Sequence, residues 1–319
     1  MKRRFAIAAA LYGVLLCVFW RAAIFFRLQI PLGPTLASFA LLFAPFWFFG
    51  FGAAAVIRRK LPRGARIAGG ALFVLPYMAF AIPLHRFDWT ITLALLALAV
   101  AVAALLSSAE HKPAALEWQD GLALALIAGP ILFNWFRAGW PVGGLGSFPK
   151  LLFTDVALYG FLVCRSLPAE ESVGYSFVFR WRDLLIGFRE WLLFAPFGIG
   201  LGLALGFIRF SPRVPSAAMA GGAWLVTFFF VAVPEELFFR GLLLNLLLPR
   251  LGRPAALISS AIIFGFSHFN KGARFNWRYV LLASIAGVLY GRAWLDRRRI
   301  FSSAITHTAV DVTWSLWFR

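Results

Sequence analysis

Two adjacent carboxylates and an arginine lie inside a long apolar segment of the chain. They are Glu235, Glu236 and Arg240. Ionisable side chains at membrane depth are costly, and they therefore mark functional sites. On an α-helix, Glu236 and Arg240 are four residues apart and share a face, so they can form an ion pair, whereas Glu235 points about 100° away. Glu235 is thus the candidate general base.

Two histidines and a third acidic residue lie in the apolar segments that follow. His268 ends the sequence Phe264-Gly-Phe-Ser-His268, and the next motif is His307-Thr-Ala-Val-Asp311. His307 and Asp311 are four residues apart, so they face the same way on a helix. Carboxylates and imidazoles are the groups that most often transfer protons in general acid–base catalysis. The pattern therefore indicates proton-transfer chemistry.

A chain reversal near residues 252–254 would bring these groups together. It lies about 17 residues after Glu235 and about 16 residues before His268. Because helices rise equally per residue, two antiparallel helices joined there place Glu235 and His268 at nearly equal depth. We therefore expect three neighbouring helices to place Glu235, His268, His307 and Asp311 around one polar cavity in a water-poor site.

The three motifs resemble those of the CPBP family, the CAAX proteases and bacteriocin-processing enzymes that are also called the Abi family. Its members carry Glu-Glu-x-x-x-Arg, then Phe-x-x-x-His, then His-x-x-x-Asn or a similar polar residue. The corresponding residues here are Glu235-Glu236 with Arg240, Phe264 with His268, and His307 with Asp311. The motifs occur in the family's order, and the resemblance covers residues 216–318, about a third of the chain.

The resemblance implies an intramembrane endopeptidase. Glu235 would be the general base that activates water, and His268 would assist it. His307 and Asp311 would stabilise the oxyanion of the tetrahedral intermediate. Such an arrangement is physically coherent, because hydrogen-bond donors aimed at a developing charge count for more in a low-dielectric site.

One residue departs from the family's pattern. Asp311 stands where prenyl-protein relatives carry asparagine, and an ionised aspartate cannot donate a hydrogen bond. Asp311 is then either protonated, or it orients and charges His307, and we favour the second role. Glu236 and Arg240 are expected to support the site as an ion pair, with Phe264 as the aromatic residue of the second motif.

A metal ion is the alternative chemistry for this site. Two histidines and a carboxylate suffice as ligands for a catalytic zinc ion, and the set here would be Glu235, His268 and His307. The chain has no His-Glu-x-x-His motif, however, and water activation by a glutamate needs no ion. We therefore predict no metal and no other cofactor, with zinc as the alternative.

Composition indicates that membrane-spanning helices position these residues. Of the 319 residues, 61% are hydrophobic and only 14% are charged, whereas soluble domains contain about 45–50% apolar and about 25% charged residues. We predict an all-α, polytopic membrane helix bundle with about 8 to 11 transmembrane helices. The candidate spans lie near residues 5–26, 32–57, 67–84, 90–108, 121–136, 148–164, 192–210, 216–248, 255–268, 279–295 and 300–318.

The net charge of +18 comes from basic residues in short clusters between apolar runs. The densest clusters, Arg58 to Arg66 and Arg297 to Arg299, favour a cytoplasmic position beside anionic lipid. We therefore predict an integral multi-pass protein, in the plasma (inner) membrane if the protein is bacterial. Membrane lipids are predicted partners, and nucleic acid is not.

The longest polar interval, residues 165–191, divides the chain. We expect it to be an interfacial amphipathic segment. It would join an N-terminal membrane region of unknown role, residues 1–175, to a CPBP-like protease region, residues 176–319. The substrate would be a protein or peptide with a hydrophobic or lipidated tail.

The alternative function is that of a non-catalytic membrane protein, either a transporter or a peptide-binding scaffold, in which the charges form a buried network. Transporters often consist of two related halves. The charged motifs occur only in the C-terminal half of this chain, which counts against a transporter.

Overall fold

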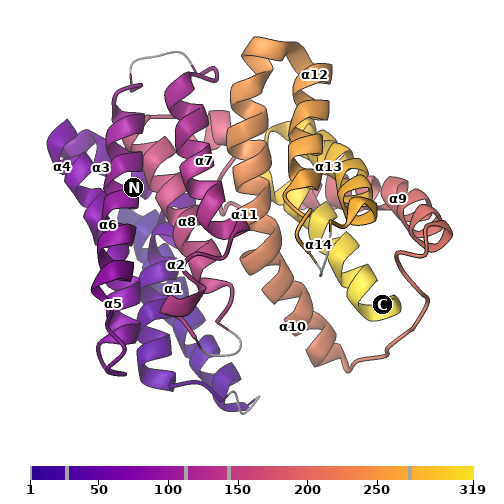
Figure 1. Cartoon of the computed structure of the whole chain (residues 1–319), viewed down its shortest axis with the longest axis horizontal. Helices are drawn as coiled ribbons and strands as arrows, with labels where there is room; N and C mark the ends of the chain where they lie inside the picture. Colours follow the sequence, from indigo (N-terminus) through magenta and orange to yellow (C-terminus); the bar gives the residue numbers. More distant parts are fainter. Residues whose placement is uncertain (1, 26–28, 111–113, 142–144, 272–274) are drawn as a thin grey trace. The chain divides into compact units, whose positions relative to one another are not determined.

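The structure is a computed structural model that describes residues 2–25, 29–110, 114–141, 145–271 and 275–319 (Figure 1). These residues are almost entirely helical. An isolated antiparallel bridge joins Phe210 to Phe318, and the described residues form no strand. The predicted all-α fold is confirmed.

The chain forms two compact units, and each is described by itself. The first unit lies within Met1–Pro113, Glu117–Ala169 and Ser176–Val178. The second lies within Ala114–Leu116, Glu170–Tyr175 and Phe179–Arg319. The different roles expected of residues 1–175 and 176–319 remain predictions.

The described residues of the first unit form eight α-helices, some of them continued by 3₁₀ or π turns. They are α1 (Lys2–Phe25), α2 (Leu32–Gly50), α3 (Ala53–Lys60), α4 (Arg63–Gly69), α5 (Leu75–Ala81), α6 (Trp89–Ser107), α7 (Trp118–Leu132) and α8 (Phe148–Leu158). Gly52 separates α2 from α3 with a φ of 91°, a conformation that glycine adopts at low cost. Inside the unit, Arg165 pairs with Asp120 at 3.0 Å, and both side chains are buried.

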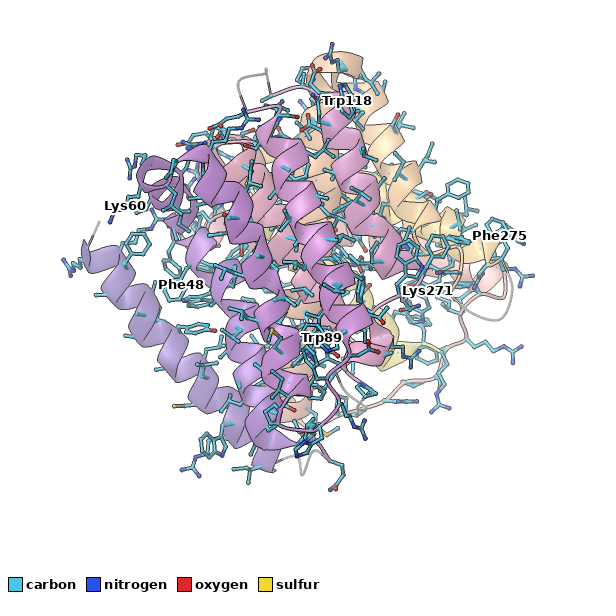
Figure 2. All side chains as sticks on the ribbon, turned by 60° about the vertical axis from the view of Figure 1, so that its left-hand side comes forward. Phe48, Lys60, Trp89, Trp118, Lys271 and Phe275 are labelled. Carbon is cyan, nitrogen blue, oxygen red and sulfur yellow. The ribbon has the colours of Figure 1, made fainter. Side chains whose placement is uncertain are left out.

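The consecutive helices α6 and α7 each begin with a tryptophan after an acidic residue. The Asp88 carboxylate accepts a hydrogen bond from the backbone N–H of Thr90 at 2.6 Å and so caps α6. The exposed rings of Trp89 and Trp118 lie at opposite ends of this helix pair (Figure 2). Exposed tryptophans at both ends are typical of helices that cross from one membrane interface to the other.

The second unit contains the three motifs. Its helices are α9 (Trp181–Ala204), α10 (Ala217–Thr227), α11 (Val233–Glu236), α12 (Asn245–Phe266), α13 (Trp277–Arg297) and α14 (Ile300–Trp317). Two π-helical stretches, Phe228–Ala232 and Leu237–Leu244, join α10, α11 and α12 into one long ribbon (Figure 1).

This ribbon reverses at Gly252, inside α12. Gly252 has a φ of 72° and a ψ of 169°, which no helical residue adopts. The hydroxyl of Ser260 donates to the carbonyl of Phe239 at 2.8 Å, and the rings of Phe239 and Phe264 lie 5.1 Å apart. The predicted antiparallel reversal near residues 252–254 is therefore present.

Six segments of the described chain are long and apolar enough to cross a membrane. They are Arg3–Ile24, Leu32–Gly50, Arg63–Ala81, Trp89–Ser107, Trp181–Ala204 and the 50-residue segment Ala217–Phe266. The last of these contains the reversal at Gly252 and so comprises two of the predicted spans. The chain is an integral, multi-pass membrane protein.

The polar interval at residues 165–191 contains the start of α9. This helix begins at Trp181, before the apolar span that was expected at residues 192–210. The acidic residues in its first turns are buried within the second unit, where the Asp183 carboxylate pairs with Arg299 at 2.8 Å. Glu190 is fully buried and pairs with Arg189 at 2.8 Å. Ion pairing within the bundle explains why α9 tolerates these charges.

Candidate active site

The two glutamates of the first motif lie on a short α-helical turn between two π-helical stretches. Pro234, next to Glu235 in α11, has no N–H to donate to Phe230 in a regular α-helix, so the local hydrogen bonding must change there. π-helical segments frequently occur at functional sites. The sequence thus builds an irregular helix at the point where Glu235 and Glu236 are placed.

The Glu236 carboxylate contacts Arg240, His307 and Ser303. Its Oε1 lies 3.1 Å from Nη1 of Arg240 and 2.8 Å from Nδ1 of His307. Its Oε2 accepts a hydrogen bond from the hydroxyl of Ser303. The side chains of Glu236 and Arg240 are fully buried. The expected Glu236–Arg240 pair is present, and the bond from Glu236 to His307 adds a connection to the third motif.

Arg240 is held by a backbone carbonyl and by aromatic rings. Its Nη2 donates to the carbonyl of Gly287 at 3.0 Å. Its guanidinium carbon lies 4.5 Å from the ring centroid of Phe264 and 5.3 Å from that of Tyr290. A Cβ on Gly287 would approach Cα of Ala261 to 3.1 Å, so glycine allows α12 and α13 to pack closely there. The aromatic residue of the second motif therefore contacts the arginine of the first.

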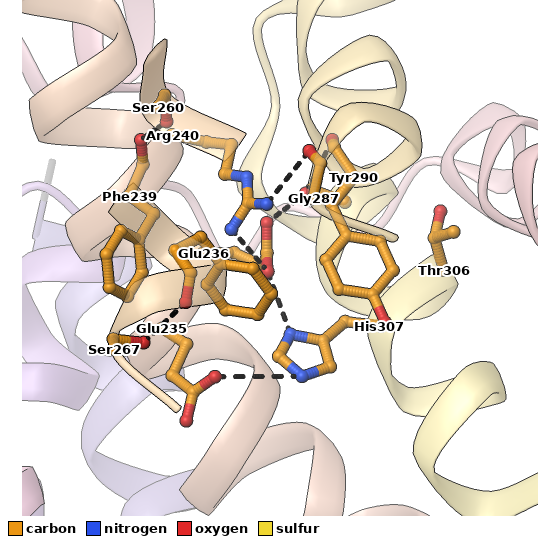
Figure 3. A network of polar contacts seen from close by, with 12 residues as sticks. Glu235, Glu236, Phe239, Arg240, Ser260, Ser267, Gly287, Tyr290, Thr306 and His307 are labelled. Carbon is orange, nitrogen blue, oxygen red and sulfur yellow. Dashed lines mark hydrogen bonds and ion pairs between the residues drawn. The ribbon is translucent and has the colours of Figure 1, made fainter. Parts of the chain in front are cut away.

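His307 lies beside both acidic residues of the first motif (Figure 3) and beside the acidic residue of the third. Its Nδ1 contacts Glu236, whereas its Nε2 lies 3.7 Å from Oε2 of Glu235 and 3.5 Å from Oδ2 of Asp311. The structure thus brings Glu235, Glu236, His307 and Asp311 together around one imidazole.

His268 has a different environment from His307. Its Nδ1 lies 3.0 Å from the carbonyl oxygen of Phe264 and 3.2 Å from the hydroxyl of Ser267. Its ring centroid lies 4.9 Å from that of Phe264, which is also 5.7 Å from the ring of His307. The two histidines are therefore connected through Phe264. Among the described residues His268 makes no ion pair with a carboxylate.

Exposure separates the carboxylates into two groups. The side chains of Glu235 and Asp311 are 17% and 35% exposed, whereas that of Glu236 is fully buried. His307 is also buried. The side chains of Glu235 and Asp311 are therefore partly open to solvent, whereas that of Glu236 is not. This arrangement can supply an accessible base, next to an imidazole that is oriented from inside the protein.

Three contacts of the site were not predicted from the sequence. They are the bond between Glu236 and His307, the Ser303 hydroxyl, and the stacking of Tyr290 on His307 at a centroid distance of 4.6 Å. Ser303 lies four residues before His307 in α14, so the spacing that linked His307 to Asp311 also points to Ser303. The Glu236–His307 bond and the stacking of Tyr290 on His307 each join two different helices, so no spacing within a single helix points to them.

A catalytic zinc ion would need about three protein ligands close to one another. Among the described residues, no group of three or more His, Cys, Asp or Glu side chains is placed to hold a metal ion. The alternative set of Glu235, His268 and His307 therefore does not form a ligand cluster in this arrangement.

Comparison with known proteins agrees with the motifs. Residues 217–313 match the family model described as type II CAAX prenyl endopeptidase Rce1-like. The match includes all residues of the three motifs. Neither a search of curated proteins nor a search of solved structures found a match. The resemblance inferred from the motifs is confirmed over residues 217–313, which are similar to the Rce1-like type II CAAX prenyl endopeptidases of the CPBP family.

Proposed function

We propose that the protein is an intramembrane endopeptidase that hydrolyses a peptide bond near the membrane. The family of residues 217–313 is one of peptidases that act on proteins or peptides. The observation that carries the proposal is the position of Glu235. Its carboxylate is partly exposed and lies 3.7 Å from Nε2 of His307, whose Nδ1 is bonded to the buried Glu236.

In the proposed reaction, Glu235 acts as the general base. Its carboxylate removes a proton from a water molecule while the water oxygen forms a bond to the carbonyl carbon of the substrate. The π electrons of the carbonyl move to its oxygen, which becomes an oxyanion. Glu235 then gives the proton to the amide nitrogen as the carbon–nitrogen bond breaks. The products are a carboxylic acid and an amine, and the base is restored.

The two histidines have separate roles in this scheme. His268 assists Glu235 by orienting the water molecule. The Nε2–H group of His307 donates a hydrogen bond to the oxyanion, and such a bond is worth more in a desolvated site than in water. In this scheme Asp311, whose Oδ2 lies 3.5 Å from Nε2, orients the imidazole.

Glu236 orients His307 in addition to pairing with Arg240. Because its Oε1 bonds Nδ1 at 2.8 Å, the opposite nitrogen is directed toward Glu235 and Asp311. A buried acceptor that fixes the direction of an imidazole is a common feature of hydrolytic sites. Glu236 is therefore a positioning residue, and it does not touch the substrate.

The substrate proposed here is a protein or peptide with a hydrophobic or lipidated C-terminal tail. The name of the matching family includes a prenyl endopeptidase activity on CAAX sequences. A tail of this kind partitions into the bilayer and so approaches a site that is enclosed by membrane helices. The plasma (inner) membrane is the proposed location if the protein is bacterial.

The test is cleavage by the purified, full-length protein in lipid vesicles. One substrate is a farnesylated peptide that ends in cysteine, two aliphatic residues and a fourth residue, and a matched peptide lacks the farnesyl group. Mass spectrometry identifies the bond that is broken. We expect cleavage by the wild-type protein and none by Glu235→Gln. Equal activity of the two proteins would refute the mechanism. Binding of both peptides without cleavage would support the scaffold alternative.

A further inference from the structure

Helix α13 carries none of the three motifs, yet two of its tyrosines contact both histidines of the proposed site. The ring of Tyr290 stacks on His307 with a centroid distance of 4.6 Å and an interplanar angle of 16°. The ring of Tyr279 lies 4.8 Å from that of His268, at 44°. Each imidazole therefore has a tyrosine of the same helix as a neighbour.

The two tyrosines share one face of α13. They are eleven residues apart, which corresponds to about three turns and an angular offset of about 20°. A single rigid helix therefore presents both rings in a fixed relation to each other. Any rotation of α13 would move both contacts together.

The packing of α13 against α12 fixes this face. A Cβ on Gly287 would lie 3.1 Å from Cα of Ala261, and a Cβ on Gly265 would lie 2.5 Å from the carbonyl oxygen of Val280. The second distance is shorter than the contacts that real Cβ atoms make. Glycine at position 265 therefore allows the backbones of α12 and α13 to pack closely there. At the start of α13, the side chain of Asn276 accepts a hydrogen bond from the backbone N–H of Tyr279 at 3.2 Å.

Both tyrosine rings are held by further aromatic contacts. Tyr290 is buried, and its ring lies 5.8 Å from that of Phe264. The ring of Tyr279 lies 5.4 Å from Trp314 and 5.4 Å from Phe207. These contacts restrict both rings to one orientation, which is what a platform for another ring requires.

One hydrogen bond to an imidazole fixes a point but not the plane of the ring. The Nδ1 atoms of His307 and His268 are bonded to Glu236 and to the carbonyl of Phe264. Each ring can still tilt about that bond, and the tilt moves Nε2. Contact with a held aromatic ring, stacked at His307 and tilted at His268, restricts this freedom.

We propose that Tyr279 and Tyr290 are positioning residues that set the planes of His268 and His307 and so direct their Nε2 atoms into the site. This inference rests on the proposed peptidase function. The required property is the aromatic ring, and the hydroxyl group contributes little. Phenylalanine should therefore replace either tyrosine, whereas leucine should not.

The kinetic test compares Tyr290→Phe with Tyr290→Leu, and Tyr279→Phe with Tyr279→Leu, on the farnesylated peptide. Both leucine variants should lower kcat by about 10- to 100-fold with little change in KM, because small displacements of catalytic groups slow the chemical step. Both phenylalanine variants should stay within about 3-fold of wild type. Equal losses in a phenylalanine and a leucine variant would overturn the role of the ring, and so would full activity of a leucine variant.

The matched control is Trp294→Leu, which removes another fully buried aromatic ring from the same helix. The indole of Trp294 donates to the carbonyl of Val173 at 3.1 Å, and its ring contacts Arg298 rather than a histidine of the site. This variant should lower the melting temperature while kcat per folded molecule stays near wild type. A loss of kcat equal to that of Tyr290→Leu would show a general packing effect and would overturn the proposal.

A second measurement does not depend on activity. The chain contains only four histidines, so NMR of protein labelled in histidine resolves each imidazole. Wild type and the phenylalanine variants should give one sharp signal each for His268 and His307. Several or broadened signals are expected for His307 in Tyr290→Leu and for His268 in Tyr279→Leu. Single sharp signals in the leucine variants would overturn the proposal. A wild-type protein that cleaves nothing would refute the peptidase function, and the NMR result would still decide the positioning role.

Discussion

Glu236 and His307 are 71 residues apart in the sequence, yet their side chains meet at 2.8 Å in the interior of the bundle. This bond connects the ion pair of the first motif to the imidazole of the third. Since Glu236 also bonds Arg240 at 3.1 Å, a change in either motif is transmitted to the other. The stability of the second unit and the direction of His307 therefore depend on the same carboxylate.

Removal of one partner of the buried pair should destabilise the protein. Arg240→Ala leaves Glu236 with one fewer positive neighbour at a fully buried position, and breaking such a pair costs about 3 to 5 kcal/mol. We expect a lower melting temperature in detergent and poor accumulation in the membrane. The control is Arg189→Ala, because the side chain of Arg189 is half exposed although it also pairs with a buried glutamate. Similar melting temperatures for the two variants would contradict the prediction.

Loss of the proposed base should abolish activity without unfolding the protein. Glu235→Gln keeps the shape of the side chain and its capacity for hydrogen bonds, and the loss of general-base catalysis should reduce kcat by about 10² or more. The melting temperature should stay near that of wild type. His268→Ala should show a similar loss, and the double variant should be no slower than the slower single variant, because the two residues act as a unit. Additive losses would argue for independent roles.

Removal of the groups assigned to the oxyanion should affect turnover more than binding. The proposed donor is His307, and Asp311 lies 3.5 Å from its Nε2. An oxyanion is present only in the transition state and the intermediate, so His307→Ala and Asp311→Ala should lower kcat with little change in KM. Steady-state kinetics on the farnesylated peptide measure this. A rise in KM at constant kcat would instead assign both residues to substrate binding.

Chelation distinguishes the base mechanism from the zinc alternative. In the proposed mechanism, activity is unchanged after treatment with a strong chelator, because no step uses an ion. Loss of activity that is restored by zinc would make Glu235, His268 and His307 the ligands. The metal content of the purified wild-type protein and of His268→Ala, measured by mass spectrometry, provides a readout that is independent of activity.

The orientation predicted from the basic clusters is testable by cysteine labelling. The chain has two cysteines, Cys17 and Cys164, and a variant without them provides the background. Single cysteines at Lys60 and Arg297 should be protected from a membrane-impermeant reagent in intact cells, since both clusters are predicted to be cytoplasmic. Ready labelling of both positions in intact cells would reverse the orientation.

The sequence predicted the elements of the site because helical spacing is regular. The pairing of Glu236 with Arg240 and the common face of His307 and Asp311 both follow from a separation of four residues, and both contacts are present. The reversal near residue 252 followed from glycine and proline in the sequence. In each case the argument needed only one helix or one turn.

Contacts between distant helices were beyond such reasoning. The bond from Glu236 to His307 depends on how α11 and α14 pack, and the stacking of Tyr290 depends on the position of α13. The start of α9 was also missed, because the buried partner of Asp183 is Arg299, 116 residues later. From the sequence alone, a charged residue is expected in a loop, because an unpaired buried charge is costly. Only the tertiary structure shows that Arg299 pairs with Asp183.

The reversal at Gly252 has a consequence for how this region tolerates insertions and deletions. Arg240 lies twelve residues before Gly252, and Phe264 lies twelve residues after it. The two residues meet because the helical arms on either side of Gly252 have equal length. Adding one residue to a single arm would shift every later side chain by about 1.5 Å and rotate it by about 100°. Side chains on the arms that face lipid can be exchanged for other apolar types, whereas the number of residues in each arm cannot change. The number of residues in each arm therefore keeps the first and second motifs in register.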